Sequence, residues 1–276
     1  MNDGEGTPTM ISDQLLTELT VFAGRLADAA AEVTLAYFRR PMDVTNKEDD
    51  GFDPVTEGDR GAEKVIRALI EEHYPEHGII GEEFGSARAD ADLVWTLDPI
   101  DGTRAFISGL PTWGTLIALS YQGEPILGVI DQPYVKERYI GSHLGATLNG
   151  KPIKSRACPQ LKYATLSTTA PELFEGKERE LWDSLHDQAQ LVRYGLDCYA
   201  YAIVASGHMD VVMETGLKIH DMAALIPVIR GAGGVATNWS GGKAGEDCED
   251  ARENGRLLAF GDPALADELY AKTKGY

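Results

Sequence analysis

The chain has 276 residues, of which 43% are hydrophobic and 25% are charged, so it can bury a substantial core as one large domain or as two fused halves. Its 25 Lys and Arg residues stand against 44 Asp and Glu residues, which gives a formal net charge of -19. We therefore expect neither a nucleic-acid partner nor an anionic membrane partner, because both require basic surfaces.

The cysteines and the N-terminal segment indicate a cytoplasmic protein. Cys158, Cys198 and Cys248 are odd in number and far apart, without a CxxC pair, so we expect free thiols in a reducing compartment. Residues 1–10 lack the basic start and apolar run of a signal peptide, and no apolar stretch reaches the length of a membrane span.

In the first half, two amphipathic helices precede several short strands. Apolar residues at helical spacing predict a long helix over 11–39, and a second helix is expected to begin after Thr56, with Asp59 three residues on as in a capping box. The polar segment 47–53 between them is expected to be a mobile loop that closes over a site. Apolar runs with Gly and Pro between them predict strands at 78–80, 93–97, 114–121 and 126–131.

In the second half, strands alternate with helices, which predicts an α/β layer. Strands are expected near 164–168, 190–194, 210–213 and 257–260, followed by helices at 172–187, at 198–207, at 221–231 and after Asp262-Pro263. The charged, Gly-rich segment 240–255 is expected to be a surface loop. We place the boundary near 145–160, so that an N-terminal α+β half (1–150) carries most of the candidate site and a C-terminal α/β half (151–276) the rest.

The segment Trp95 to Phe106, WTLDPIDGTRAF, carries the densest chemical signal. A predicted strand ends at Asp98, and Asp101 follows three residues later, so both carboxylates can converge on one cation. Magnesium suits such oxygen ligands. The amides of Gly102 and Thr103 would lie at a helix start, where an anion such as phosphate is favoured. On spacing alone, an Asp-rich turn that caps a helix is an equally acceptable interpretation.

Two further acidic positions are weaker signals when taken singly. Glu82 lies in the Gly-bounded loop of GIIGEEFG, where a pair of Glu residues is usually just solvated. Asp221 is expected to start the helix of HDMAALIPVIRGAGG, where it could simply be an N-cap. Only their combination with Asp98 and Asp101 points to a site.

Taken together, these motifs resemble the inositol monophosphatase superfamily. GEEFG, then DPIDGT beginning sixteen residues after Glu82, then an Asp before AALIPVIRGAGG follow the order of that family along residues 12–270. The resemblance implies a layered αβαβα sandwich, two or three Mg²⁺ ions per site, a small phosphorylated metabolite as substrate and a homodimer. It also implies roles for individual site residues.

Carried over residue by residue, the resemblance assigns the metals and the attacking water to named groups. Glu82, Asp98 and the Ile100 carbonyl would hold a first ion, and Asp98, Asp101 and Asp221 a second. Glu82 would share a third, and in that way take part in catalysis. Thr103, paired with Asp59, would orient and deprotonate the water, while the Gly102 and Thr103 amides receive phosphate oxygens. Metals of this kind neutralise phosphoryl charge and activate water.

Within the superfamily, the sequence most resembles bacterial histidinol-phosphate phosphatases. FDPVTEGDRGAEKVIRALI, DGTRAFISGLPTWGTLIAL and VRYGLDCYAYAIVASGHMDVV carry this resemblance. The chain departs from that branch at Ile219-His220, where Pro-Tyr is common, and at Leu196, where Gly is usual. Arg193, Asp197 and Glu214 are the candidates for binding the far end of the substrate, and Glu214 stands where the family has an acid for a substrate hydroxyl. The alternative to substrate binding is that Arg193 and Asp197 form a structural ion pair under a turn.

We therefore expect a phosphatase for histidinol phosphate. The alternatives are inositol monophosphatase, bisphosphate nucleotidase or fructose bisphosphatase activity, and, more remotely, a non-catalytic binding protein. Pocket residues separate the first four, since the fold alone does not define a substrate.

Overall fold

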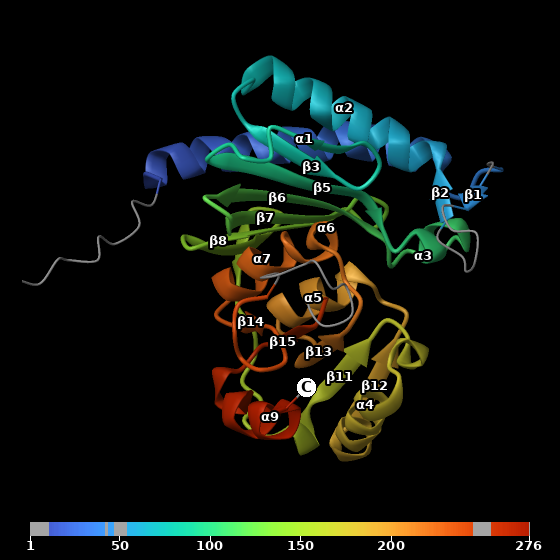
Figure 1. Ribbon diagram of the computed structural model, residues 1–276, viewed down its shortest axis with the longest axis vertical. Helices are drawn as coiled ribbons and strands as arrows, with labels where there is room; N and C mark the ends of the chain where they lie inside the picture. The colour runs from blue at the N-terminus through green and yellow to red at the C-terminus, as the bar shows by residue number, and fades with distance from the viewer. Residues whose placement is uncertain (1–10, 42–43, 47–53, 245–254, 276) are drawn as a thin grey trace, which may run out of the picture.

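The computed structural model describes residues 11–41, 44–46, 54–244 and 255–275, and within them the elements stack in five layers. Two long helices cover an eight-stranded sheet, a layer of short helices lies beneath it, and a five-stranded sheet with two outer helices completes the stack (Figure 1). This is the predicted αβαβα sandwich. Among the described residues, no helix is long and apolar enough to cross a membrane.

The first layer consists of α1 (Asp13–Tyr37) and α2 (Glu57–His73). Ser12 caps α1 by accepting a hydrogen bond from the Leu15 amide, and Thr56 and Asp59 form the predicted capping box of α2. The apolar stripes of both helices pack on one face of the eight-stranded sheet. Their placement fixes where the first turn of α2 meets the sheet.

The eight-stranded sheet is mostly antiparallel. Its order is β10-β9-β8-β7-β6-β5-β3-β4, and only the neighbours β3 and β5 run parallel. In β6, Ile117 and Leu119 face α1 and α2, while Leu116 and Ala118 face the middle helices, as strand alternation requires. The strands are β3 (Gly78–Gly81), β4 (Gly85–Ala87), β5 (Leu93–Asp101), β6 (Gly114–Tyr121), β7 (Glu124–Gln132), β8 (Glu137–Ser142), β9 (Gly145–Leu148) and β10 (Lys151–Ile153).

The middle layer joins the two sheets through one buried core. It contains α5 (Cys198–Ala205), α6 (Ile219–Met222) and α7 (Leu225–Gly231), and α7 lies against β7 and β8. Apolar residues of both sheets meet these helices in a single cluster. The two sheets are therefore held together by packing as well as by the chain.

The five-stranded sheet has the order β12-β11-β13-β15-β14, with β12, β11 and β13 parallel to one another. Val211 and Met213 pack toward α4 and α9, whereas Val212 packs toward the middle layer. The elements are β11 (Thr165–Thr168), β12 (Leu191–Tyr194), β13 (Val211–Glu214), β14 (Val235–Thr237), β15 (Leu257–Phe260), α4 (Gly176–Gln188) and α9 (Ala266–Thr273), together with the small β1 (Val44–Asn46), β2 (Pro54–Thr56) and α3 (Thr103–Ile107) outside the two sheets.

Several predicted elements need correction. The helix expected over 221–231 is two helices, α6 and α7, because Pro227 has no amide hydrogen and its ring would clash with the carbonyl of residue 223. Asp221 lies inside α6, not at its start. The helix expected at 172–187 is a 3₁₀ turn at Pro171–Leu173 followed by α4. The strands β1, β2, β4, β8, β9, β10 and β14 were not predicted, because they are short or lack a clear apolar run.

Three expectations are limited by what the structure describes. The loop predicted at 47–53, most of the predicted surface loop at 240–255, and Cys248 lie outside the described residues, while Cys158 and Cys198 are free and buried. The division at residue 150 stays a prediction, although the eight-stranded sheet extends to Ile153 and the other sheet begins at Thr165.

Candidate metal-dependent active site

The candidate site lies where the carboxyl ends of parallel strands from both sheets converge. Glu82 follows β3, Asp98 and Asp101 lie at the end of its parallel neighbour β5, and Thr169 follows β11 in the other sheet. Ligands of α/β proteins commonly bind beyond such strand ends. Here a cavity of about 400 Å³ opens at this position, and these four residues line it.

A break in the β5–β6 pairing places Asp98 and Asp101 together. The register shifts between these two residues, and the Pro99 carbonyl accepts a hydrogen bond from the Thr115 hydroxyl at 2.8 Å instead of joining the ladder. The Ile100 amide donates to Asp98 Oδ1 at 3.1 Å, and the Cys198 amide donates to Asp101 Oδ2 at 2.7 Å. The bulge therefore turns both carboxylates toward the middle helix layer.

Asp221 joins them from the opposite side of the cavity. It is the third residue of α6, and its Oδ2 accepts a hydrogen bond from the Lys218 amide at 2.6 Å, which fixes the carboxylate in the first turn. His220 Nε2 lies 3.5 Å from Asp221 Oδ1. Ligand oxygens of Asp98, Asp101 and Asp221 all lie within 4.8 Å of one another.

The electrostatics of this cluster favour a bound cation. Burial raises the pKa of Asp98 well above its usual value, and the negative charges of Glu82, Asp101 and Asp221 raise it further. Burial likewise raises the pKa values of Asp101 and Asp221. One buried and two half-buried carboxylates that repel one another are stabilised when a hard cation lies between them. The donor atoms are all carboxylate oxygens, which Mg²⁺ and similar cations prefer, so the residues present fit a divalent metal.

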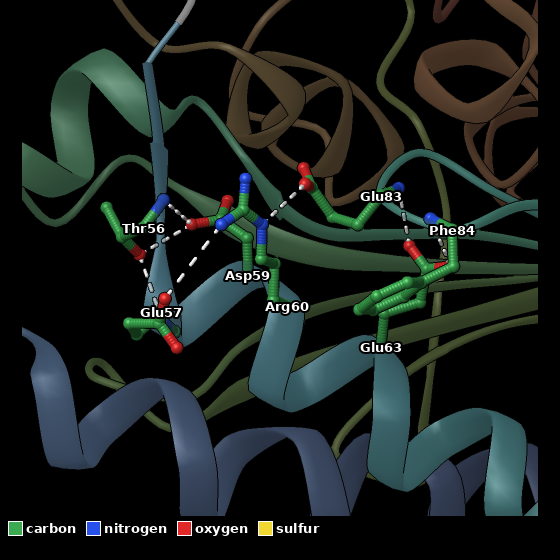
Figure 2. Close-up of polar contacts among 8 residues, drawn as sticks. Thr56, Glu57, Asp59, Arg60, Glu63, Glu83 and Phe84 are labelled. Atoms are coloured by element: carbon green, nitrogen blue, oxygen red, sulfur yellow. Dashed lines mark hydrogen bonds and ion pairs between the residues drawn. The ribbon is translucent and has the colours of Figure 1, made fainter. Parts of the chain in front are cut away.

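The turn that follows β3 places Glu82 at the cavity, and residues of α2 contact the backbone and side chains of this turn. Figure 2 shows Glu63 of α2 beneath the amides of Glu83 and Phe84, and Arg60 beside the Glu83 carboxylate. Glu82 lines the cavity but lies outside the tight cluster of three carboxylates. Its charge still acts on Asp98, whose pKa it raises.

The predicted pair of Thr103 and Asp59 is not joined by a hydrogen bond in the described structure. Asp59 is 1% exposed, and its Oδ2 accepts from the amide and the hydroxyl of Thr56, because it completes the capping box (Figure 2). The Thr103 hydroxyl instead donates to the Ile100 carbonyl at 3.0 Å. Burial raises the pKa of Asp59 to about 7. The roles proposed for both residues in water activation stay predictions.

Gly102 is required by its conformation and by its neighbour. Its φ is +79°, and a Cβ there would lie 2.9 Å from Asp197 Cγ. Asp197 occupies the N-cap position of α5 without a capping hydrogen bond from its side chain, and its φ of 49° and ψ of -140° are a conformation that non-glycine residues adopt at a cost. Strained backbone of this kind clusters at functional sites. Burial, with a contribution from Glu214, raises the pKa of Asp197 to about 7, while Arg104 lowers it. Asp197 lines the cavity, as the sequence analysis expected of a substrate residue.

The other two predicted substrate residues lie outside the cavity lining. Arg193 is exposed on the edge strand β12. Glu214 is 4% exposed, and its two oxygens accept hydrogen bonds of 2.8 Å each from the Thr169 amide and the Tyr201 hydroxyl. Burial raises the pKa of Glu214. Its observed contacts hold Thr169 at the cavity wall, and direct substrate contact by Arg193 or Glu214 stays a prediction.

Five further residues line the same cavity and were not singled out from the sequence. Two are cationic, Arg104 and Lys218, and a third, Leu173, is apolar and exposed. Arg104 follows DGT directly and Lys218 precedes Asp221 by three residues, so adjacency to the acidic motifs was the available signal. The five are Arg104, Thr169, Leu173, Gly216 and Lys218.

The comparisons with known proteins agree with this fold. The sequence matches the inositol monophosphatase family over residues 15–275, and with the layered fold and the acidic cluster this makes the protein a metal-dependent phosphomonoesterase. The chain belongs to the inositol monophosphatase family.

Individual relatives carry different names. The chloroplastic bifunctional phosphatase IMPL2 of Arabidopsis thaliana is 47% identical over 243 residues, 87% of this chain and 70% of that protein. A histidinol-phosphatase of Chlorobaculum parvum is 40% identical over 219 residues, 78% of this chain and 84% of that protein. The solved structure of an inositol monophosphatase from Zymomonas mobilis has 40% identity and a TM-score of 0.84, and the match covers 96% of this chain and 100% of that one.

Proposed function

We propose that the protein hydrolyses the phosphomonoester of a small alcohol that carries a positive charge, and that L-histidinol phosphate is its preferred substrate. The observation that carries the proposal is the pairing, in one cavity, of the Asp98, Asp101 and Asp221 cluster with a further acid, Asp197. The first group suits metal ions and the phosphate they bind, and Asp197 suits an ammonium or imidazolium group on the alcohol.

The residues of the cluster would hold divalent metal ions, with Glu82 and the Ile100 carbonyl as further ligands. When bound, such ions neutralise charge on the phosphoryl group and lower the pKa of water. Gly102 and Thr103 would present amides to phosphate oxygens at the start of α3. Arg104 and Lys218 add positive charge to the same cavity, which suits a phosphate dianion. Thr103 and Asp59 would orient the attacking water.

The alcohol would be held from the five-stranded sheet side. Asp197 is fixed against Gly102, so its carboxylate has a defined position near the predicted phosphate site. A charged hydrogen bond contributes roughly 1.5–3 kcal/mol, against about 1 kcal/mol for a neutral one. One carboxylate can therefore favour a cationic alcohol over neutral inositol by about tenfold. The similarity to histidinol-phosphatases supports this proposal.

Inositol 1-phosphate is the second candidate. The similarity to the Zymomonas mobilis inositol monophosphatase supports it, and so does His220, which would repel a cationic alcohol when protonated. His220 would alternatively stack on an imidazole ring.

The test is kcat/KM for both phosphate esters with wild type, Asp197→Asn, Glu214→Gln and His220→Tyr. We expect wild type to prefer histidinol phosphate, and Asp197→Asn to lose activity on histidinol phosphate by about tenfold more than on inositol 1-phosphate. Equal losses on both esters, or a wild type that prefers inositol 1-phosphate or a nucleoside bisphosphate, would refute the substrate assignment and leave the metal-dependent phosphatase intact.

A further inference from the structure

The turn that carries Glu82 is anchored at four consecutive residues. The Glu82 amide donates to the Leu97 carbonyl of β5 at 3.2 Å. The next two amides, those of Glu83 and Phe84, donate to the Glu63 carboxylate at 2.7 and 3.2 Å, and the Gly85 carbonyl accepts from Arg67 Nη2. The backbone on both sides of the Glu82 side chain is therefore held.

Glu63 and Arg67 form a buried ion pair within α2. Glu63 is 0% exposed, and its Oε1 accepts from Arg67 Nε at 2.6 Å, while the Arg67 side chain is 14% exposed. The charge of Glu63 is thus balanced by one arginine and two amides, which satisfies a carboxylate that burial would otherwise destabilise. Neither residue lines the cavity.

The Glu63 and Arg67 side chains lie directly against the backbone of Gly81, where β3 ends and the turn begins. A Cβ on Gly81 would lie 2.0 Å from Glu63 Oε1, so glycine is required where β3 ends. Figure 2 shows the Glu63 carboxylate at the backbone amides of Glu83 and Phe84. A movement of the carboxylate would therefore be transmitted to the turn.

From these contacts, we infer that Glu63 and Arg67 are positioning residues that set the place of Glu82 and thereby the affinity of the site for a divalent metal. The inference rests on the proposed role of Glu82 as a metal ligand. Groups that orient metal ligands through hydrogen bonds commonly change metal affinity by 10–100-fold when they are replaced.

Glu63→Gln tests this inference with a nearly isosteric change. A glutamine has one acceptor oxygen and an NH₂ group, so it cannot accept from Arg67 and from both amides at once, and the NH₂ group faces a donor. Arg67→Lys keeps the positive charge but loses the fork that spans Glu63 and the Gly85 carbonyl. Gly81→Ala disrupts the same contact, because the added Cβ would displace the Glu63 carboxylate.

The matched control is Asp131→Asn. Asp131 is 3% exposed and accepts from Arg138 Nε at 2.6 Å, so it resembles Glu63 in being a buried carboxylate paired with an arginine, although its Oδ2 accepts no hydrogen bond among the described residues. Through Arg138, which also donates to the Gly24 carbonyl, the pair ties β7 and β8 to α1, and Asp131 does not line the cavity. Its replacement reports what the loss of a buried carboxylate does to stability alone.

The measurement is Mg²⁺ binding by titration calorimetry, together with the Mg²⁺-induced rise in Tm, for wild type and all variants. We expect the Kd for Mg²⁺ to rise by roughly tenfold in Glu63→Gln, Arg67→Lys and Gly81→Ala, and to stay within about twofold of wild type in Asp131→Asn. If Glu63→Gln and Asp131→Asn bind Mg²⁺ equally well, the pair serves stability only and the inference is wrong. Glu82→Gln distinguishes a failure of the positioning role of Glu63 and Arg67 from a failure of the proposed metal role of Glu82. If Glu82→Gln binds Mg²⁺ as wild type does, the proposed metal role of Glu82 is wrong.

Discussion

Asp98→Asn tests two properties of the acidic cluster separately: the electrostatic repulsion that destabilises the metal-free protein, and the contribution of the carboxylate to turnover. The substitution removes one negative charge from three carboxylates whose oxygens lie within 4.8 Å of one another, and the asparagine oxygen can still accept from the Ile100 amide. At that separation and an effective dielectric constant of about 20, each like-charge pair costs roughly 3 kcal/mol. Protons and solvent ions relieve part of this repulsion in the folded protein. We therefore expect the metal-free variant to be more stable than wild type by about 1–3 kcal/mol.

Thermal unfolding in EDTA measures this difference. A gain of about 1–3 kcal/mol corresponds to a rise in Tm of about 2–10 °C for a protein of this size. Turnover in Mg²⁺ should fall by at least about a hundredfold, since Asp98 would hold more than one metal ion. A variant with near wild-type turnover would refute the metal role of Asp98. A lower Tm in EDTA would refute the electrostatic argument, because it would show that Asp98 stabilises the fold without metal.

Three further outcomes are expected. Gly102→Ala should lower stability by about 1–2 kcal/mol, because alanine disfavours φ +79°, and it should abolish turnover by displacing Asp197; wild-type kcat would contradict this. Tyr201→Phe should lower stability by about 1–3 kcal/mol, measured by urea unfolding, because buried Glu214 loses a donor; an unchanged midpoint would contradict the contact. Saturating Mg²⁺ at about 100 times its Kd should stabilise wild type by about 2.7 kcal/mol over the chelated protein, and an unchanged Tm would argue against a metal site.

The parts of the site that follow from local pattern could be predicted from the sequence. Asp98 and Asp101 lie at the end of a strand that an apolar run predicts, and Glu82 follows a second such run. Their convergence requires β3 and β5 to be parallel neighbours, which was not predicted and which the structure shows. The layered fold was predicted from the family resemblance and is confirmed.

The parts that depend on competition between partners could not be predicted. Asp59 was expected to pair with Thr103. Its Oδ2 instead accepts hydrogen bonds from the amide and the hydroxyl of Thr56, in the capping box that the sequence also predicts. Glu214 lies at a strand end, and only the tertiary contacts with Thr169 and Tyr201 show where its oxygens are used. The break between α6 and α7 carried a local signal in Pro227, which the apolar periodicity across 221–231 concealed.

We propose that this protein uses metal ions held by Asp98, Asp101 and Asp221 to hydrolyse the phosphate ester of a cationic alcohol. The most direct test is phosphate release from L-histidinol phosphate and from inositol 1-phosphate, each in Mg²⁺ and in EDTA. We predict release from histidinol phosphate in Mg²⁺ with about tenfold or greater preference in kcat/KM over inositol 1-phosphate, and no release in EDTA. Undiminished release in EDTA, or no release from either ester in Mg²⁺, would contradict the account.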